Sequence, residues 1–154
     1  MASTRGLWLN PTEMAAWRAF IETIGDLQYQ LDADLKEATG LVAGDYQVLV
    51  YLSESPDRCL RMCDLASRLN LTPSGLTRRL DGLVKDGSVR RRPSPDDRRV
   101  QLAELTDDGY ARLVDAAPHH VRSVRERFVD RLDDRQLTAL ASAFASIKKG
   151  LEQS

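Results

Sequence analysis

The sequence is poor in the residues that most enzymes use for chemistry. It holds only two histidines, His119 and His120, and on a helix neighbouring side chains point about 100° apart, so this pair is unsuited to chelating one metal ion. No third histidine, glycine-rich phosphate loop or nucleophile motif accompanies them in the sequence. We therefore predict that the protein is not an enzyme and uses no metal or cofactor.

Cysteine is also scarce, and long apolar runs are absent. Only Cys59 and Cys63 are present, which argues against a disulfide framework and favours a reducing compartment. No apolar run approaches the roughly 18 residues of a membrane span, and the N-terminus lacks the apolar core of a signal peptide. We therefore expect a cytoplasmic protein. The close spacing of the two cysteines leaves a thiol-based switch open, although small packed side chains are the simpler interpretation.

The composition is that of an ordinary globular chain, but its charge is unevenly distributed. With 154 residues, 42% apolar and 29% charged, the sequence predicts one domain with its own core. Residues 72–99 hold eight basic and four acidic side chains, a net charge of +4, whereas the rest hold 14 basic and 19 acidic ones, a net charge of −5. A basic segment on an acidic body is typical of a surface that binds nucleic acid.

A helix with one polar face is predicted inside this basic segment. Thr72 suits the N-cap, Pro73 suits the first helical position, and Gly87 suits the position after the helix ends. The predicted buried stripe consists of Leu76, Leu80, Leu83 and Val84, and the opposite face of Ser74, Thr77, Arg78 and Asp81. Small hydroxyl side chains and an arginine at the exposed end suit a helix that enters a DNA major groove. An ordinary solvated helix face is the alternative for this helix alone.

The segment before this helix reads as the first half of a helix-turn-helix. Residues 63–69 predict its first helix, with Cys63 at the capping position, and residues 70–71 make the turn. Upstream, residues 45–53 predict a short apolar helix that packs under the helix-turn-helix, and residues 59–61 predict a short strand.

A hairpin is predicted after the helix. Residues 88–92 read as one strand, 93–97 as a turn and 99–105 as the returning strand, with Val100, Leu102 and Leu105 as its apolar side chains. The tip carries Asp97, Arg98 and Arg99. A carboxylate two residues from an arginine can fix its guanidinium, and an arginine held in this way suits a narrow minor groove.

Three long helices flank the predicted helix-turn-helix and hairpin. The first starts with an Asn10 cap and Pro11 and ends at Gly40; the second runs from Thr106 to about Leu132, with a kink expected at Pro118. A capping box at residues 133–136 opens the third, which runs to residue 151. Their apolar stripes exceed what one small head can cover, so we expect a second copy of the chain to cover them; burial within a monomer is the alternative.

Four motifs together resemble the MarR family of winged-helix transcription regulators: residues 71–78 (LTPSGLTR), 83–87 (LVKDG), 97–99 (DRR) and 105–109 (LTDDG). The resemblance implies a mainly α fold with a small β-wing, in a single domain spanning residues 1–154. In that domain, residues 10–39 and 106–151 would form dimerisation helices, and residues 45–105 the winged helix-turn-helix lobe that binds DNA.

The resemblance also implies a function for the homodimer, that of a repressor bound to an inverted-repeat DNA operator and released by a small aromatic or phenolic effector. Ser74, Thr77 and Arg78 would face base edges, while Thr72 and Arg79 would contact phosphates beside Pro73. Arg99, held by Asp97 and flanked by Arg98, would enter the minor groove. Trp8 and Trp17 would lie near the family's effector cleft, whose residues the sequence does not assign. A protein-contact module and a redox regulator using Cys59 and Cys63 are the alternatives.

Overall fold

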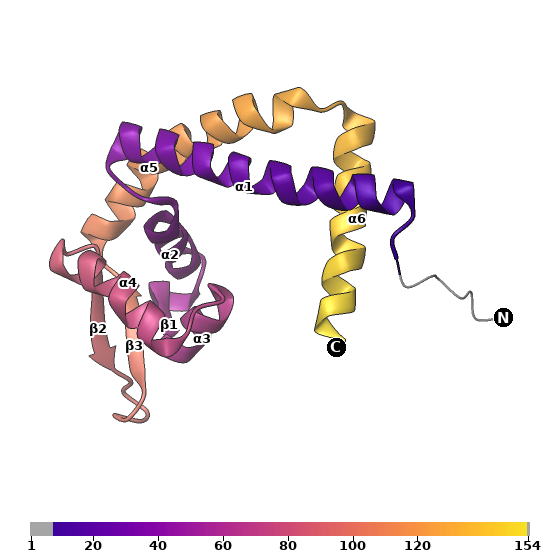
Figure 1. Cartoon of the computed structure of the whole chain (residues 1–154). Helices are drawn as coiled ribbons and strands as arrows, with labels where there is room; N and C mark the ends of the chain where they lie inside the picture. The colour runs from indigo at the N-terminus through magenta and orange to yellow at the C-terminus, as the bar shows by residue number, and fades with distance from the viewer. Residues whose placement is uncertain (1–7, 154) are drawn as a thin grey trace.

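The structure is a computed structural model that describes residues 8–153. Six α-helices and a three-stranded antiparallel sheet make up the described part, together with two short 3-10 turns, 56–58 and 129–131. Figure 1 shows a packed head, made of α2, α3, α4 and the sheet, from which α1, α5 and α6 extend. The α-helices are α1 (Pro11–Thr39), α2 (Ala43–Ser53), α3 (Met62–Arg68), α4 (Pro73–Lys85), α5 (Asp107–Arg127) and α6 (Asp134–Glu152).

The ends of the long helices are set by local capping. Asn10 and Glu13 form a reciprocal capping box at the start of α1, each side chain accepting the other residue's backbone N–H at 2.9 Å. Gly40 ends the helix with a φ of 75°, a conformation that costs a residue without a side chain little. Asp133 and Gln136 form a second box that opens α6. The predicted start and end of α1 and the start of α6 are confirmed.

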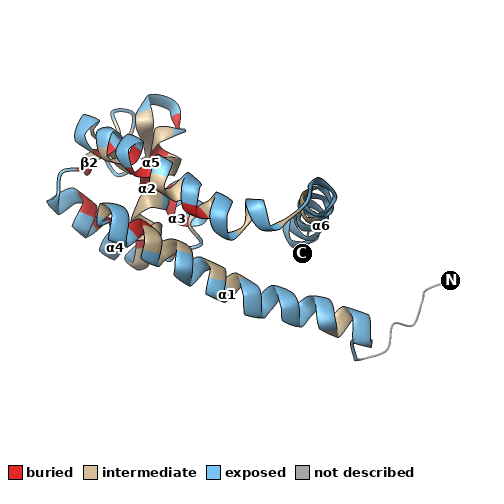
Figure 2. Ribbon diagram, turned by 90° about the horizontal axis from the view of Figure 1, so that it is seen from above, coloured by how far each residue is buried: buried red, intermediate tan, exposed pale blue. Residues whose placement is uncertain are grey.

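The core of the head lies between the helices and one face of the sheet. Its buried members come from α2, α3, α4, β2 and β3, from the end of α1 and from the first half of α5, and Leu60 of β1 packs against them partly buried. The largest fully buried side chains are Leu35, Leu41, Val48, Leu49, Leu52, Leu65, Leu76, Leu80, Leu83 and Val89. Figure 2 shows that the buried residues gather in the head, while the outer half of α1 and all of α6 are exposed or half-buried. The mainly α fold with a small β-wing is confirmed.

The sheet has the order β1-β3-β2, in which β1 is Cys59–Arg61, β2 is Val89–Pro93 and β3 is Gln101–Leu105. The predicted third strand at residues 59–61 is therefore confirmed. The return strand begins two residues later than predicted, because residues 98–100 are held in the turn by a bond from the Val100 N–H to the Asp97 carbonyl at 2.9 Å. Of the three predicted apolar side chains, Leu105 faces the core together with Ala103, while Val100 and Leu102 are only half-buried.

One predicted helix stripe needs correction. Val84 is exposed because it lies about 80° around the helix from Leu76, at the edge of the leucine stripe. In α5, Leu113 and Ala116 are buried within the chain, whereas Val114 and Val121 are exposed, so the chain itself leaves part of this helix's apolar surface uncovered.

Some predicted boundaries also differ from the observed ones. Helix α5 runs unbroken through Pro118 but ends at Arg127, five residues earlier than predicted. Helix α3 begins at Met62, so Arg61 and not Cys63 takes the N-cap position. None of the helices in residues 8–153 is long and apolar enough to cross a membrane.

Candidate nucleic-acid interface

Helix α4 presents the predicted polar face to solvent. Thr72 caps it by accepting the Gly75 N–H at 3.1 Å, and the three leucines of the stripe anchor its inner side. Ser74, Thr77 and Arg78 are exposed on the outer side, and within the described residues the Arg78 guanidinium has no hydrogen-bond or ion-pair partner. The structure thus brings together the three side chains that the sequence assigned to base edges and leaves the arginine available.

Arg79 has a different environment from the rest of this face. Its guanidinium turns toward α2 and forms a 3.3 Å ion pair with Asp45, and both side chains are about one-third exposed. Gly44 makes room for it, because a side chain at this position would collide with the guanidinium. The predicted phosphate contact of Arg79 stays a prediction, and it requires this ion pair to be shared or broken.

The tip of the hairpin is organised around Asp97. Its carboxylate accepts the Arg99 backbone N–H at 3.0 Å and both Nε–H and Nη2–H of the same side chain at 3.2 Å. The hydrogen bonds from Arg99 lower the pKa of Asp97, so the carboxylate stays charged at neutral pH. Arg99 is nevertheless 91% exposed, and Arg98 beside it is exposed as well. The expected pairing of Asp97 with Arg99 is present and leaves most of the guanidinium open to a ligand.

Arg91 links the hairpin to α4, a role that the sequence analysis missed. From β2, its Nη2–H group donates to the Thr77 carbonyl oxygen and to Asp81 Oδ1, both at 2.8 Å. Asp81, predicted to lie on the open face of α4, is thereby engaged. The signal was available in the sequence, because strand alternation places the middle arginine of residues 90–92 on the face opposite its neighbours. Arg91 fixes the angle between the helix and the hairpin, which together form the candidate interface.

The neighbours of Arg91 share one carboxylate on the other face of the sheet. Glu104 of β3 accepts from Arg90 Nη2 at 2.6 Å and from Arg92 Nε at 2.5 Å. Hydrogen bonding to Arg90, opposed by burial, lowers the pKa of Glu104. Each arginine of residues 90–92 is therefore paired with a carboxylate of the same chain.

The LTDDG motif connects the head to α5. Thr106 caps α5 by accepting the Gly109 N–H at 3.0 Å, and its hydroxyl lies 2.6 Å from the Gly87 carbonyl oxygen. Gly109 packs against the Ser88 carbonyl so closely that any side chain there would collide with it. Arg112 adds a 2.5 Å ion pair to Asp86 at the end of α4. The motif thus attaches the hairpin and the reading helix firmly to the long helix.

The cysteines and histidines do not form a chemical centre. Cys59 is half-buried, and burial raises the pKa of its thiol; Cys63 is exposed, and both thiols are free. His120 packs on the Tyr46 ring with 4.7 Å between centroids, and burial lowers its pKa. No group of three metal-ligating side chains occurs in the described part of the chain. The redox alternative stays a prediction.

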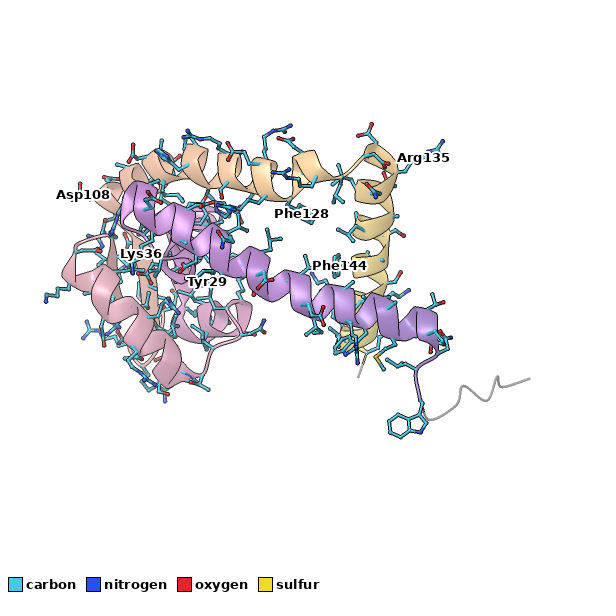
Figure 3. All side chains as sticks on the ribbon, turned by 45° about the horizontal axis from the view of Figure 1, so that its top comes forward. Tyr29, Lys36, Asp108, Phe128, Arg135 and Phe144 are labelled. Atoms are coloured by element: carbon cyan, nitrogen blue, oxygen red, sulfur yellow. The ribbon has the colours of Figure 1, made fainter. Side chains whose placement is uncertain are left out.

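The helices beyond the head expose the apolar stripes that the sequence predicted. Phe20 of α1 and Phe144 of α6 meet with 5.6 Å between ring centroids, yet both remain exposed (Figure 3). Other exposed apolar side chains on these two helices are Trp17, Ile21, Ile147 and Leu151. A hollow of about 560 Å³ between α1 and the end of α5 is lined mostly by polar and charged residues, and neither Trp8 nor Trp17 lines it. The expected position of the two tryptophans near an effector cleft stays a prediction.

Comparisons with known proteins agree with this geometry. Residues 39–100 match the sequence profile of the MarR family. The chain is similar to Sco3205 of Streptomyces coelicolor, a MarR family transcriptional regulator solved in complex with DNA, at 40% identity, 94% coverage of each chain and a TM-score of 0.88. It is also similar to AbsC, another MarR family regulator of that organism, at 38% identity, 97% and 100% coverage and a TM-score of 0.89.

A curated relative points the same way. The HTH-type transcriptional repressor YetL of Bacillus subtilis is 36% identical over 108 residues, which are 68% of this chain and 65% of YetL. The match therefore spans slightly less than two thirds of that relative's length.

Proposed function

Since this chain belongs to the MarR family of DNA-binding transcription regulators, which are not enzymes, we propose that it is a repressor that binds an inverted-repeat operator as a homodimer. One observation carries the proposal: the exposed face of α4 and the Arg99 tip belong to the same head, in which Arg91 of the hairpin is hydrogen-bonded to α4. The name of YetL, a repressor, and the DNA complex of Sco3205 support it.

Base recognition is assigned to α4. Ser74, Thr77 and Arg78 would lie in the major groove, where small side chains permit close approach and an arginine can bond guanine O6 and N7. Thr72 and Pro73 lie at the start of the helix and Arg79 in its middle, and we assign contacts with phosphate oxygens to them, which would fix the register on DNA.

The hairpin tip would add a second, shape-dependent contact. Arg99 is held by Asp97 and would enter the minor groove, where a narrow groove has the most negative potential, with Arg98 contacting the backbone beside it. Because its guanidinium is already oriented, less conformational entropy is lost on binding.

Dimerisation would place two such units side by side. The exposed stripes of α1 and α6 are large and apolar, and a two-fold axis lets identical stripes cover each other. Two reading helices on one DNA face would then contact half-sites whose centres lie about 10 bp apart.

Release would follow from a small aromatic or phenolic effector that binds more tightly to a dimer whose heads are spaced unsuitably for DNA. Such an effector shifts the population only in proportion to its differential affinity for the two states. No residues are assigned to its site.

The test is fluorescence anisotropy with the DNA upstream of the protein's own gene, at several salt concentrations, for the wild type, Arg99→Ala and Arg135→Ala. Arg135 is the matched control, because it lies exposed at the corner between α5 and α6, far from the head (Figure 3). We expect a tight, palindrome-dependent complex that Arg99→Ala weakens about ten-fold, with a salt slope reduced by about one, and that Arg135→Ala leaves unchanged.

Binding to that DNA no tighter than to random duplex would contradict repression of its own gene, and selection of sites from genomic DNA would follow. Failure in that selection as well would contradict the DNA-binding proposal and leave a protein-contact module.

A further inference from the structure

The charges at the tip of the hairpin cancel one another. Asp96 and Asp97 supply two negative charges, and Arg98 and Arg99 supply two positive ones. Hydrogen bonds from Arg99 lower the pKa of Asp97, so its carboxylate is ionised at neutral pH. The tip alone therefore offers no net attraction to a DNA phosphate, and a net attraction has to come from a basic side chain outside the tip.

Arg61 brings a positive charge to this tip from another strand. It is the last residue of β1 and the N-cap of α3, and the register places it opposite Leu102 of β3. Strand β3 begins at Gln101, two residues after Arg99, so Arg61 lies at the end of the sheet that borders the tip. Its charge acts on Asp97, because the attraction of Arg61 lowers the pKa of that carboxyl further, after the hydrogen bonds from Arg99.

The Arg61 guanidinium is available to a ligand. The side chain is exposed, and no hydrogen bond or ion pair with another residue in the range 8–153 holds it. The register places Arg92 on the same face of the sheet, across Leu102, and there the pairing differs, since Arg92 and Arg90 share the Glu104 carboxylate. Arg61 is therefore an unpaired positive charge beside the tip.

We propose that Arg61 is a further DNA-binding residue, which contacts a backbone phosphate beside the groove that Arg99 enters. The inference rests on the DNA-binding function proposed above. With Arg61 the tip region holds three arginines and two aspartates, a net charge of +1, so it attracts DNA of every sequence. The hairpin extends past β1 (Figure 1). Arg61 is thus set back from the tip, where it meets the phosphate backbone and helps to fix the position of the tip on the duplex.

The test compares Arg61→Ala and Arg61→Lys with the wild type by fluorescence anisotropy, on operator and random duplexes across a range of salt concentrations. We expect Arg61→Ala to lose affinity about five-fold for both duplexes at about 0.15 M salt, with a log–log salt slope less steep by about 0.9. Arg61→Lys keeps the charge and should bind within about two-fold of the wild type. A loss confined to the operator would overturn the proposal, because a phosphate contact does not depend on sequence.

The matched control is Arg135→Ala, which makes the same change in net charge at the corner between α5 and α6 (Figure 3). At about 0.15 M salt an exposed charge acts over about 8 Å, so this variant should bind both duplexes like the wild type. Equal losses in the two variants would overturn the proposal, because they would reflect total charge alone.

A double variant separates direct contact from an effect that passes through Asp97 and Arg99. If Arg61 contacts DNA itself, Arg61→Ala and Arg99→Ala act independently, and their combination should weaken binding about 50-fold, the product of the two single losses. A double variant no weaker than Arg99→Ala would overturn the proposal, as would an Arg61→Ala salt slope equal to that of the wild type. If the wild type binds no duplex, the proposed function fails first, which is a distinct outcome.

Discussion

The head and the outer parts of the long helices differ in whether their apolar side chains are buried within the chain. In the head, the leucines of α2, α3 and α4 are almost completely buried by side chains of the same chain. In α6, none of 19 residues is buried, although the helix carries a regular apolar stripe (Figure 2). Apolar residues at helical spacing are thus covered by the same chain in the head and left exposed in α6.

This difference indicates what each region requires in order to be stable. Burial of one leucine is worth about 1.5–3 kcal/mol, and the head gains this many times over from its own residues. Helix α6 gains little of it within the chain, and isolated helices are marginal in water. The head, together with the parts of α1 and α5 that complete its core, should therefore be stable within one chain, whereas the stability of the outer helices should depend on a second surface.

The largest effect should come from removing a leucine from the head. Leu80 is fully buried, so Leu80→Ala should lower the free energy of unfolding by about 3 kcal/mol, through lost burial and the cavity left behind. Leu151→Ala removes the same atoms from a side chain that is 74% exposed in the single chain and should cost the monomer less than about 1 kcal/mol. Urea unfolding followed by circular dichroism measures both. Equal losses would show that the two regions do not differ as described.

A charge on the stripe of α6 should act on assembly instead of on the fold of the head. Phe144→Asp should raise the dissociation constant of the homodimer at least about 30-fold, because an aspartate would be buried there without a partner. Ser142→Asp places the same charge on the opposite face of α6 and should leave dimerisation unchanged. Sedimentation equilibrium separates the cases. A wild type that is monomeric at every concentration would contradict the expected dimer.

The ion pair that links α1 to α5 should make the smallest contribution to the free energy of unfolding, and this contribution should depend on pH. Asp34 of α1 accepts from Arg127 of α5 at 2.5 Å and 2.7 Å and also from the Ser123 hydroxyl. These bonds, those from Arg127 first, lower the pKa of Asp34 from 3.8 to about 2. A depressed pKa stabilises the folded state above the unfolded-state value, and this contribution is lost as the pH falls from about 4 to 2.

Because the pair is about one-third exposed, we expect the contribution to be about 1 kcal/mol. Asp34→Asn should be less stable than the wild type by this amount at pH 6, and the two should converge near pH 2. Urea midpoints at one protein concentration measure the difference. A gap that is constant with pH would show that the ion pair is not its cause.

Much of the architecture was predictable because it depends on neighbours in the chain. The Asn10–Glu13 box, the Gly40 stop and the Thr72 cap each involve residues at most four apart or a single backbone angle. The pairing of Asp97 with Arg99 is equally local. The predicted contacts of these residues with DNA stay predictions.

Contacts between residues distant in the sequence were the ones that sequence reasoning missed. Nothing near Arg79 indicates that Asp45 will take its charge. Strand alternation places Arg91 on the face opposite its neighbours, but it does not indicate that α4 lies on that face. Val84 and Val114 belong to regular apolar stripes, but whether a stripe is covered depends on which elements pack beside it. Periodicity shows which residues share a face, and it does not show what that face meets.

The sequence by itself determined the order of the elements, the capped ends of α1, α4 and α6 and the basic segment, because capping, periodicity and turn chemistry act over a few residues. Only the tertiary structure decided which arginines remain available. Arg78, Arg98 and Arg99 face solvent, Arg99 while paired with its close neighbour Asp97, whereas Arg79, Arg91 and the two arginines that share Glu104 are bound to carboxylates of other elements. The physical reason is that the availability of a charge depends on its partners in space, and the fold brings those partners from up to 34 residues away.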